Sequence, residues 1–101
     1  MQPLKTTQPV RKLNRNVKII KFKNHYETWH SEKTDPKSNL NIPGRHVDEN
    51  GVIRDKNNFV VISVSRDLIA EGTKINTSLG MGKRYDTLPN QTKTVSVFTN
   101  W

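Results

Sequence analysis

The sequence predicts a small, mostly β domain with an extended, basic N-terminal arm. Three observations lead to this prediction. The chain of 101 residues is long enough for one domain. Short runs rich in β-branched and aromatic residues recur at intervals of about 8–12 residues, between turns that contain Gly or Asn. The net charge of +8 is concentrated near the N-terminus.

The composition excludes several kinds of protein. The chain is 32% hydrophobic and its mean hydropathy is -0.79, so we expect a small core, and either part of the chain lies outside that core or a partner helps to cover it. There is no cysteine, which excludes disulfides and cysteine-ligated metals. No apolar run approaches the ~18 residues that span a bilayer, and we expect no secretory signal.

The N-terminal arm holds most of the net charge. The other 78 residues carry ten bases and nine acids, so the arm contributes +7 of the +8. Such an arm binds an acidic partner, or else it is a solvated tail. Nucleic acid is the weaker partner, because Phe22, Tyr26 and Trp29 come only at the arm's end and do not alternate with the bases. Residues 1–23 contain no acid and seven bases: Lys5, Arg11, Lys12, Arg15, Lys18, Lys21 and Lys23.

The first strand follows directly from this arm. Residues 17–23 (VKIIKFK) mix β-branched residues, an aromatic residue and lysines, which is typical of an edge strand guarded by lysine. We expect residues 25–30 (HYETWH) to continue it. Residues 31–42 are polar, contain a proline, and are expected to form a loop.

Signals for the later elements are sharper. Residues 48–51 (DENG) and 55–58 (DKNN) are predicted turns, the first between Val47 and Val52. Residues 59–65 (FVVISVS) are expected to be the central strand, and residues 66–70 one helical turn that ends before Gly72.

The C-terminal part is expected to contain three further strands. These are residues 73–77, 83–86 and 94–99, with a tight turn at Gly80-Met81-Gly82 and a Pro-Asn turn at 89–90.

Residues 59–99 also follow a spaced series of motifs. A strand with ISVS at 62–65 precedes a loop that ends in GTKI at 72–75, followed by YDT at 85–87 and VSVF at 95–98. This order resembles the 3D (three-aspartate) domain, a double-psi β-barrel shared with MltA-type lytic transglycosylases, cell-wall proteins and phage tail proteins. The resemblance implies a small double-psi-like β-barrel over residues 41–101. Residues 1–40 then form the basic arm with its edge strand.

The resemblance also implies a candidate catalytic residue. In the lytic transglycosylase relatives, the aspartate that matches Asp86 is the general acid/base. Ser65 and Ser96 occupy the other two aspartate positions, and Leu88-Pro89 stands where the family has two glycines. One carboxyl suits transglycosylase chemistry, whereas ordinary glycoside hydrolysis uses two. These departures favour a degenerate relative over an enzyme.

Tryptophans and histidines give the remaining candidate sites. Trp29 and Trp101 are candidate contacts to a carbohydrate or a partner, although core anchoring is the more common role of such residues. His25 and His30 are five residues apart, which places them on opposite faces of a strand. We therefore expect no metal site, and no cofactor.

Three functional hypotheses follow. The leading one is a structural, virion- or tail-associated protein of phage type whose arm docks on neighbouring subunits. The alternatives are a peptidoglycan lytic transglycosylase that uses Asp86, and nucleic-acid binding through the arm. The expected partners are other protein subunits of an assembly, then peptidoglycan or another acidic polymer, then nucleic acid, and not a membrane. The expected location is the virion, or the bacterial cytoplasm before assembly.

Overall fold

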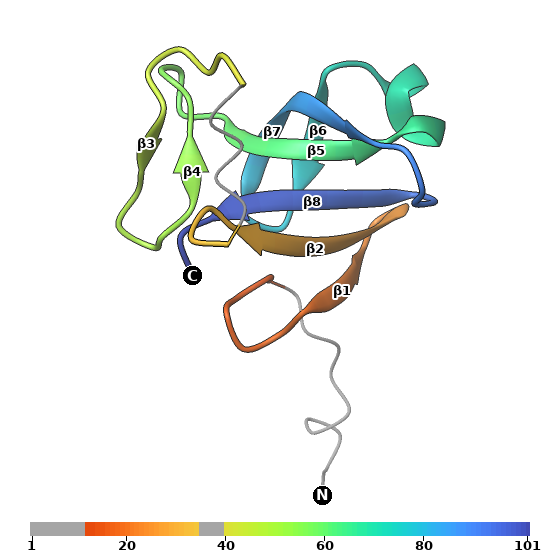
Figure 1. Cartoon of the computed structure of the whole chain (residues 1–101). Coiled ribbons are helices and arrows are strands. Elements are labelled where there is room, and N and C mark those ends of the chain that lie inside the picture. The colour runs from red at the N-terminus through yellow and green to blue at the C-terminus, as the bar shows by residue number, and fades with distance from the viewer. Residues whose placement is uncertain (1–11, 35–39) are drawn as a thin grey trace, which may run out of the picture.

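The computed structural model describes residues 12–34 and 40–101, which form one eight-stranded sheet and a short 3-10 helix (Figure 1). The predicted small, mostly β fold is therefore confirmed. Lys5 and Arg11 lie outside the described residues. In chain order the elements are β1 (Ile19–Phe22), β2 (His25–Ser31), β3 (His46–Val47), β4 (Ile53–Arg54), β5 (Val60–Ser65), η2 (Arg66–Glu71), β6 (Lys74–Thr77), β7 (Gly80–Leu88) and β8 (Thr94–Thr99).

The sheet is branched and open. Its main path runs β1-β2-β8-β5-β4-β3, and β7 pairs with β5 and with β6. The β2–β8 and β5–β7 pairs are parallel, while the β1–β2, β5–β8 and β6–β7 pairs are antiparallel. In the described part of the chain, β1, β3 and β6 each pair with one strand only, so the sheet does not close into a barrel.

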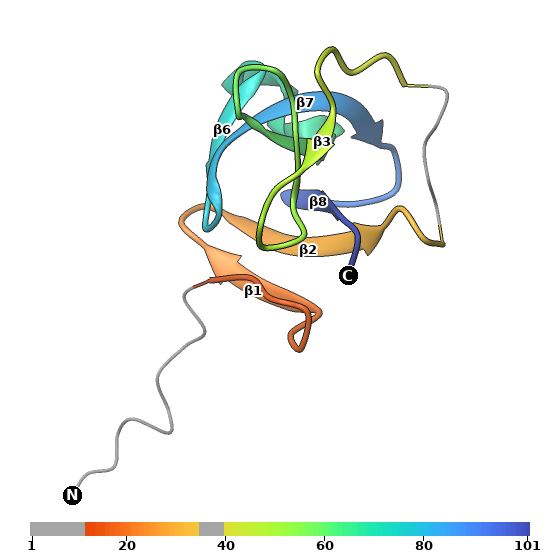
Figure 2. The same cartoon turned by 90° about the vertical axis from the view of Figure 1, so that its left-hand side faces the viewer.

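The chain reverses where the sequence suggested a continuous strand. A two-residue turn at Lys23 and Asn24 separates β1 from β2, and Lys23 adopts a φ of +53°. β2 then lies between β1 and β8 (Figure 2). The expected boundary at residue 40 thus does not separate an arm from the sheet, because β1 and β2 are strands of that sheet. The prediction that β1 is an edge strand is confirmed.

The main core lies on one face of the sheet. Alternating residues of β5 (Val60, Ile62, Val64) and β8 (Val95, Val97) point to this face and are fully buried. Leu13 belongs to the same core and is 1% exposed. The segment just before β1, which we call the base of the arm, is therefore packed into the core. Each such side chain stabilises the fold by about 1.5–3 kcal/mol. A second, smaller cluster on the other face contains Ile42, Ile53, Val61 and Phe98.

Most predicted turns are confirmed. Chain reversals occur within 48–51 and 55–58, η2 forms the expected helical turn, and Pro89-Asn90 separates β7 from β8.

The turn predicted at 80–82 was wrong in position. β6 and β7 are joined at Ser78 and Leu79, and β7 already begins at Gly80. Gly82 lies inside β7, where an added Cβ would come within 2.9 Å of Ile62 Cδ1, so this glycine permits close packing.

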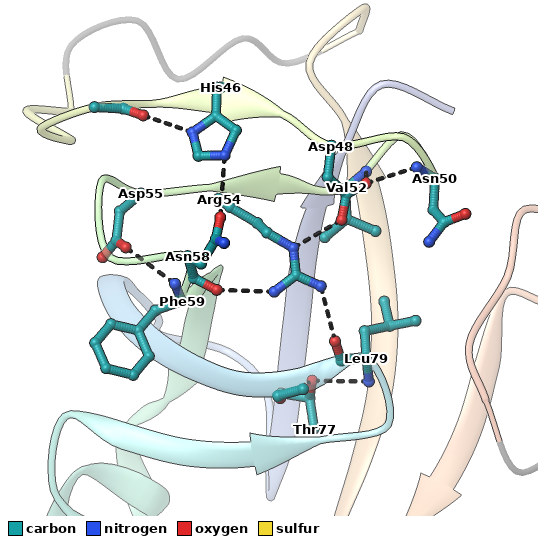
Figure 3. Close-up of polar contacts among 12 residues, drawn as sticks. His46, Asp48, Asn50, Val52, Arg54, Asp55, Asn58, Phe59, Thr77 and Leu79 are labelled. Atoms are coloured by element: carbon teal, nitrogen blue, oxygen red, sulfur yellow. Dashed lines mark hydrogen bonds and ion pairs between the residues drawn. The ribbon is translucent and has the colours of Figure 1, made fainter.

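Arg54 joins the β3–β4 hairpin to the β6–β7 turn (Figure 3). Its Nε donates to Asp48 Oδ2 at 2.7 Å, and its Nη2 donates to the carbonyl oxygen of Leu79 at 3.0 Å. Burial would raise the pKa of Asp48, but the hydrogen bond from Arg54 and the N–H groups of Val52 and Asn50 outweigh it and hold that pKa below its usual value.

Asp55 has a similar structural role in the next turn. Burial would raise its pKa, but hydrogen bonds from the Tyr85 hydroxyl and from the N–H groups of Phe59 and Asn57 hold it below its usual value. Burial and the neighbouring Asp55 carboxylate raise the pKa of Tyr85 to about 12. Both aspartates therefore stabilise turns as ionised groups.

Candidate functional site

Five exposed bases lie within residues 12–23, the segment that leads into β1 and through it, and we call them the basic edge: Lys12, Arg15, Lys18, Lys21 and Lys23. None of them forms an ion pair with any residue that the structure describes. By contrast, Arg45 pairs with Glu32 and Arg54 pairs with Asp48. The basic edge therefore presents positive charge that the described part of the fold leaves unneutralised.

Aromatic rings lie next to three of these bases. Lys18 Nζ is 4.2 Å from the centre of the Trp29 ring, and Lys21 Nζ is 5.7 Å from that of Tyr26. Lys23 Nζ lies 5.5 Å from the centre of the Phe22 ring. At exposed sites each such contact stabilises by about 0.5–1 kcal/mol. The hairpin thus brings Lys18 and Lys21 next to aromatic rings of β2 that lie further along the sequence.

Trp29 and Trp101, the two predicted contact residues, lie together. Their rings are 5.2 Å apart in an edge-to-face arrangement, and both pack against the main core. The Trp29 indole N–H donates to the Val17 carbonyl at 2.9 Å, and the Trp101 indole N–H donates to the Asn50 carbonyl at 2.8 Å. Both indoles therefore anchor neighbouring loops, and Trp29 also supports the basic edge through Lys18.

Asp86 belongs to a row of polar residues on the face of the sheet opposite the main core. The register aligns Thr28 with Ser96, Ser96 with Ser63, and Ser63 with Asp86, across β2, β8, β5 and β7. His30 Nδ1 is 2.7 Å from Ser96 Oγ. A groove of about 390 Å³ runs beside this row and is lined by Ile19, Thr28, His30, Ser63, Leu88, Gln91, Thr94 and Ser96.

The three positions that match the family's aspartates lie on strands β5, β7 and β8. Asp86 is half-buried, and its Oδ1 accepts the Thr87 N–H at 2.9 Å. Ser96 faces the groove. Ser65, the last residue of β5, instead bonds to neighbouring backbone and side chains, because its hydroxyl donates to Asp67 at 2.6 Å and accepts the Thr94 N–H. These bonds give Ser65 a structural role.

A buried carboxylate that the sequence did not single out connects the arm to the sheet. Glu27 is 0% exposed. It accepts hydrogen bonds from Ser78 N at 2.8 Å and Ser78 Oγ at 2.7 Å, and His25 Nε2 lies 3.0 Å from its Oε2. Ser78 Oγ in turn accepts the Leu13 N–H at 2.9 Å. Nothing in HYETWH distinguishes Glu27 from an exposed glutamate, so only the fold shows this role.

The histidines lie as the strand alternation predicted. His25 faces Glu27 on the core side of β2, and His30 faces Ser96 on the groove side. In residues 12–34 and 40–101, no group of three or more histidine or acidic side chains could hold a metal ion.

A comparison with known proteins found no matching family model, no matching curated protein and no matching solved structure. Within the described ranges, no helix has the length and apolar character needed to cross a membrane.

Proposed function

We propose that the chain is a structural subunit of an assembly, and that its basic edge docks on an acidic surface of a neighbouring subunit. One observation carries this proposal: five exposed bases lie within residues 12–23, and no described residue forms an ion pair with them. An acidic partner would neutralise this charge, accelerate association and select the docking orientation.

Packing at the base of the arm supports the same proposal. Leu13 is buried in the core and Trp29 lies beneath Lys18, so the bases project from a rigid support. A rigid support reduces the ordering cost of binding. The resemblance to phage tail and cell-wall proteins supports a virion or a tail as the setting.

Matched lysine substitutions test the docking proposal. Replacing Lys18, Lys21 and Lys23 by Gln removes three charges from the basic edge. Replacing the exposed Lys33, Lys56 and Lys74 by Gln removes the same charge elsewhere. The probe is a fluorescent ten-residue peptide rich in glutamate. Single-stranded DNA of equal charge is tested as the alternative ligand.

We expect the first triple variant to lose at least about tenfold in peptide affinity at low salt, and the second to lose less than threefold. Tighter binding of DNA than of peptide, with a steep salt dependence, would support nucleic-acid binding through the arm instead. Equal effects of the two triple variants would contradict a role for the basic edge.

The second candidate function is lytic transglycosylase activity with Asp86 as the general acid/base. Its support is the row that joins Asp86 to Ser63 and Ser96, next to a groove that contains His30. Purified sacculi incubated with the chain would then release muropeptides, and Asp86→Asn would abolish the release. Absence of release between about pH 4 and 8 would exclude this activity.

A further inference from the structure

We infer that the partner docks by adding a strand: an extended acidic segment of a neighbouring subunit pairs with the free edge of β1. This inference rests on the proposed function and specifies its partner class and binding mode. Among the residues that the structure describes, β1 lies at the end of the main sheet path and pairs only with β2 (Figures 1 and 2). Such an edge is a template for an added strand.

The register shows which backbone groups of β1 are available. The Tyr26 N–H donates to the Lys93 carbonyl at 2.7 Å, so Tyr26 directs its backbone groups toward β8. Lys21 is the partner of Tyr26 in the β1–β2 pair, and antiparallel partners that do not bond each other direct their groups outward. Lys21 therefore directs its N–H and C=O away from the sheet, and so does Ile19, two residues earlier.

Charge determines which kind of strand can bind. The three strands at the ends of the sheet, β1 (IIKF), β3 (HV) and β6 (KINT), contain no aspartate or glutamate. A second copy of this chain would thus place lysine or neutral residues opposite Lys21, and like charges opposite each other destabilise a sheet. An acidic segment would instead place a carboxylate opposite Lys21, with further carboxylates near Lys18 and Lys23 at the two ends of β1.

The side chains of β1 favour a partner strand in which acidic and apolar residues alternate. Ile19 and Lys21 are two residues apart and lie on the outer face of β1, whereas Ile20 and Phe22 pack against the main core. An added alternating strand would place its acidic row beside Lys21 and its apolar row beside Ile20 and Phe22. The matching partner segment therefore alternates acidic residues with β-branched ones.

The test uses the full chain and two peptides of ten residues that alternate glutamate with valine. One peptide has an ordinary backbone. The other has the same sequence but carries N-methyl groups at alternate positions, so one edge cannot donate hydrogen bonds. Lys21→Pro removes the outward N–H, while Lys21→Ala removes the same charge and keeps that N–H. Proline is tolerated on an edge strand where the N–H faces solvent. Circular dichroism checks that both variants fold.

We expect the ordinary peptide to bind at least about tenfold more tightly than the N-methylated one, and Lys21→Pro to bind it at least about tenfold more weakly than Lys21→Ala. Equal binding of both peptides, with equal affinities of both variants, would overturn strand addition but leave acidic docking intact. Failure of both peptides to bind at low salt would overturn the proposed function as well. Binding of single-stranded DNA alone would overturn both in favour of a nucleic-acid partner.

Discussion

Glu27→Ala perturbs the network that holds the base of the arm. The substitution removes acceptors for three hydrogen-bond contacts, to Ser78 N, Ser78 Oγ and His25 Nε2, at a site that is 0% exposed. Unsatisfied buried donors cost about 1–3 kcal/mol each, and of these partners His25 is 5% exposed while Ser78 is only partly buried. We expect a loss of about 3 kcal/mol in the free energy of unfolding.

Thermal unfolding measures this loss. For a domain of this size, 1 kcal/mol corresponds to about 4–8 °C in Tm, so Glu27→Ala is expected to unfold about 12–24 °C earlier than the wild type. Glu49→Ala is the matched control, because Glu49 is exposed in a turn, and its effect is expected to stay within about 0.5 kcal/mol. Equal Tm values for the two variants would refute the role assigned to Glu27.

The same network predicts a local effect. Ser78 Oγ accepts the Leu13 N–H, and it is positioned by Glu27. Hydrogen exchange at the Leu13 amide is therefore expected to accelerate in Glu27→Gln, even if most of the stability is retained. Unchanged protection of Leu13 would show that the arm is held by packing alone.

Three further outcomes follow from the fold. Asp55 has a lowered pKa in the folded state, so the ionised side chain stabilises the fold above its unfolded pKa of about 3.9, and this contribution is lost as the pH falls below that value. Asp55→Asn should therefore flatten the decline of Tm measured between about pH 5 and 2. Tyr85 has a pKa raised to about 12, so its contribution to the stability of the fold is complete below about pH 10 and is lost as the pH rises toward 12. Ultraviolet titration in a Tyr26→Phe background should show the ionisation of Tyr85 as a late tyrosinate transition. Gly82→Ala should destabilise the fold by about 1–3 kcal/mol in urea unfolding, because its Cβ would approach Ile62, and an unchanged midpoint would show that Ile62 can move aside.

The sequence predicts most strands of this fold because their signals are local. The FVVISVS run identifies β5, and aspartate-initiated turns identify the β3–β4 hairpin and the β4–β5 connection. The β1–β2 turn is missed because Lys23 occupies a positive-φ position that is usually taken by Gly or Asn. The β6–β7 turn is misplaced because Gly80 and Gly82 suggest a turn at Met81, whereas both serve β7.

Long-range pairing accounts for the rest. β2 pairs in parallel with β8 over a separation of 68 residues, from Tyr26 to Thr94, and no periodicity in the sequence encodes that choice. The same pairing brings His30 to Ser96 and forms the groove. Seven bases with no acid are visible in residues 1–23, but only the β1–β2 hairpin shows that Lys18, Lys21 and Lys23 line a free sheet edge beside aromatic rings.

Amide hydrogen exchange with and without the glutamate–valine peptide tests the docking account most directly, because it locates the bound segment on the fold. If the basic edge is the docking surface, exchange at the Ile19 and Lys21 amides slows on peptide binding, whereas the amides of β6, the edge strand that pairs with β7 on the other branch, keep their rates. Slower exchange along the groove strands or β6, with unchanged rates at Ile19 and Lys21, would contradict the account.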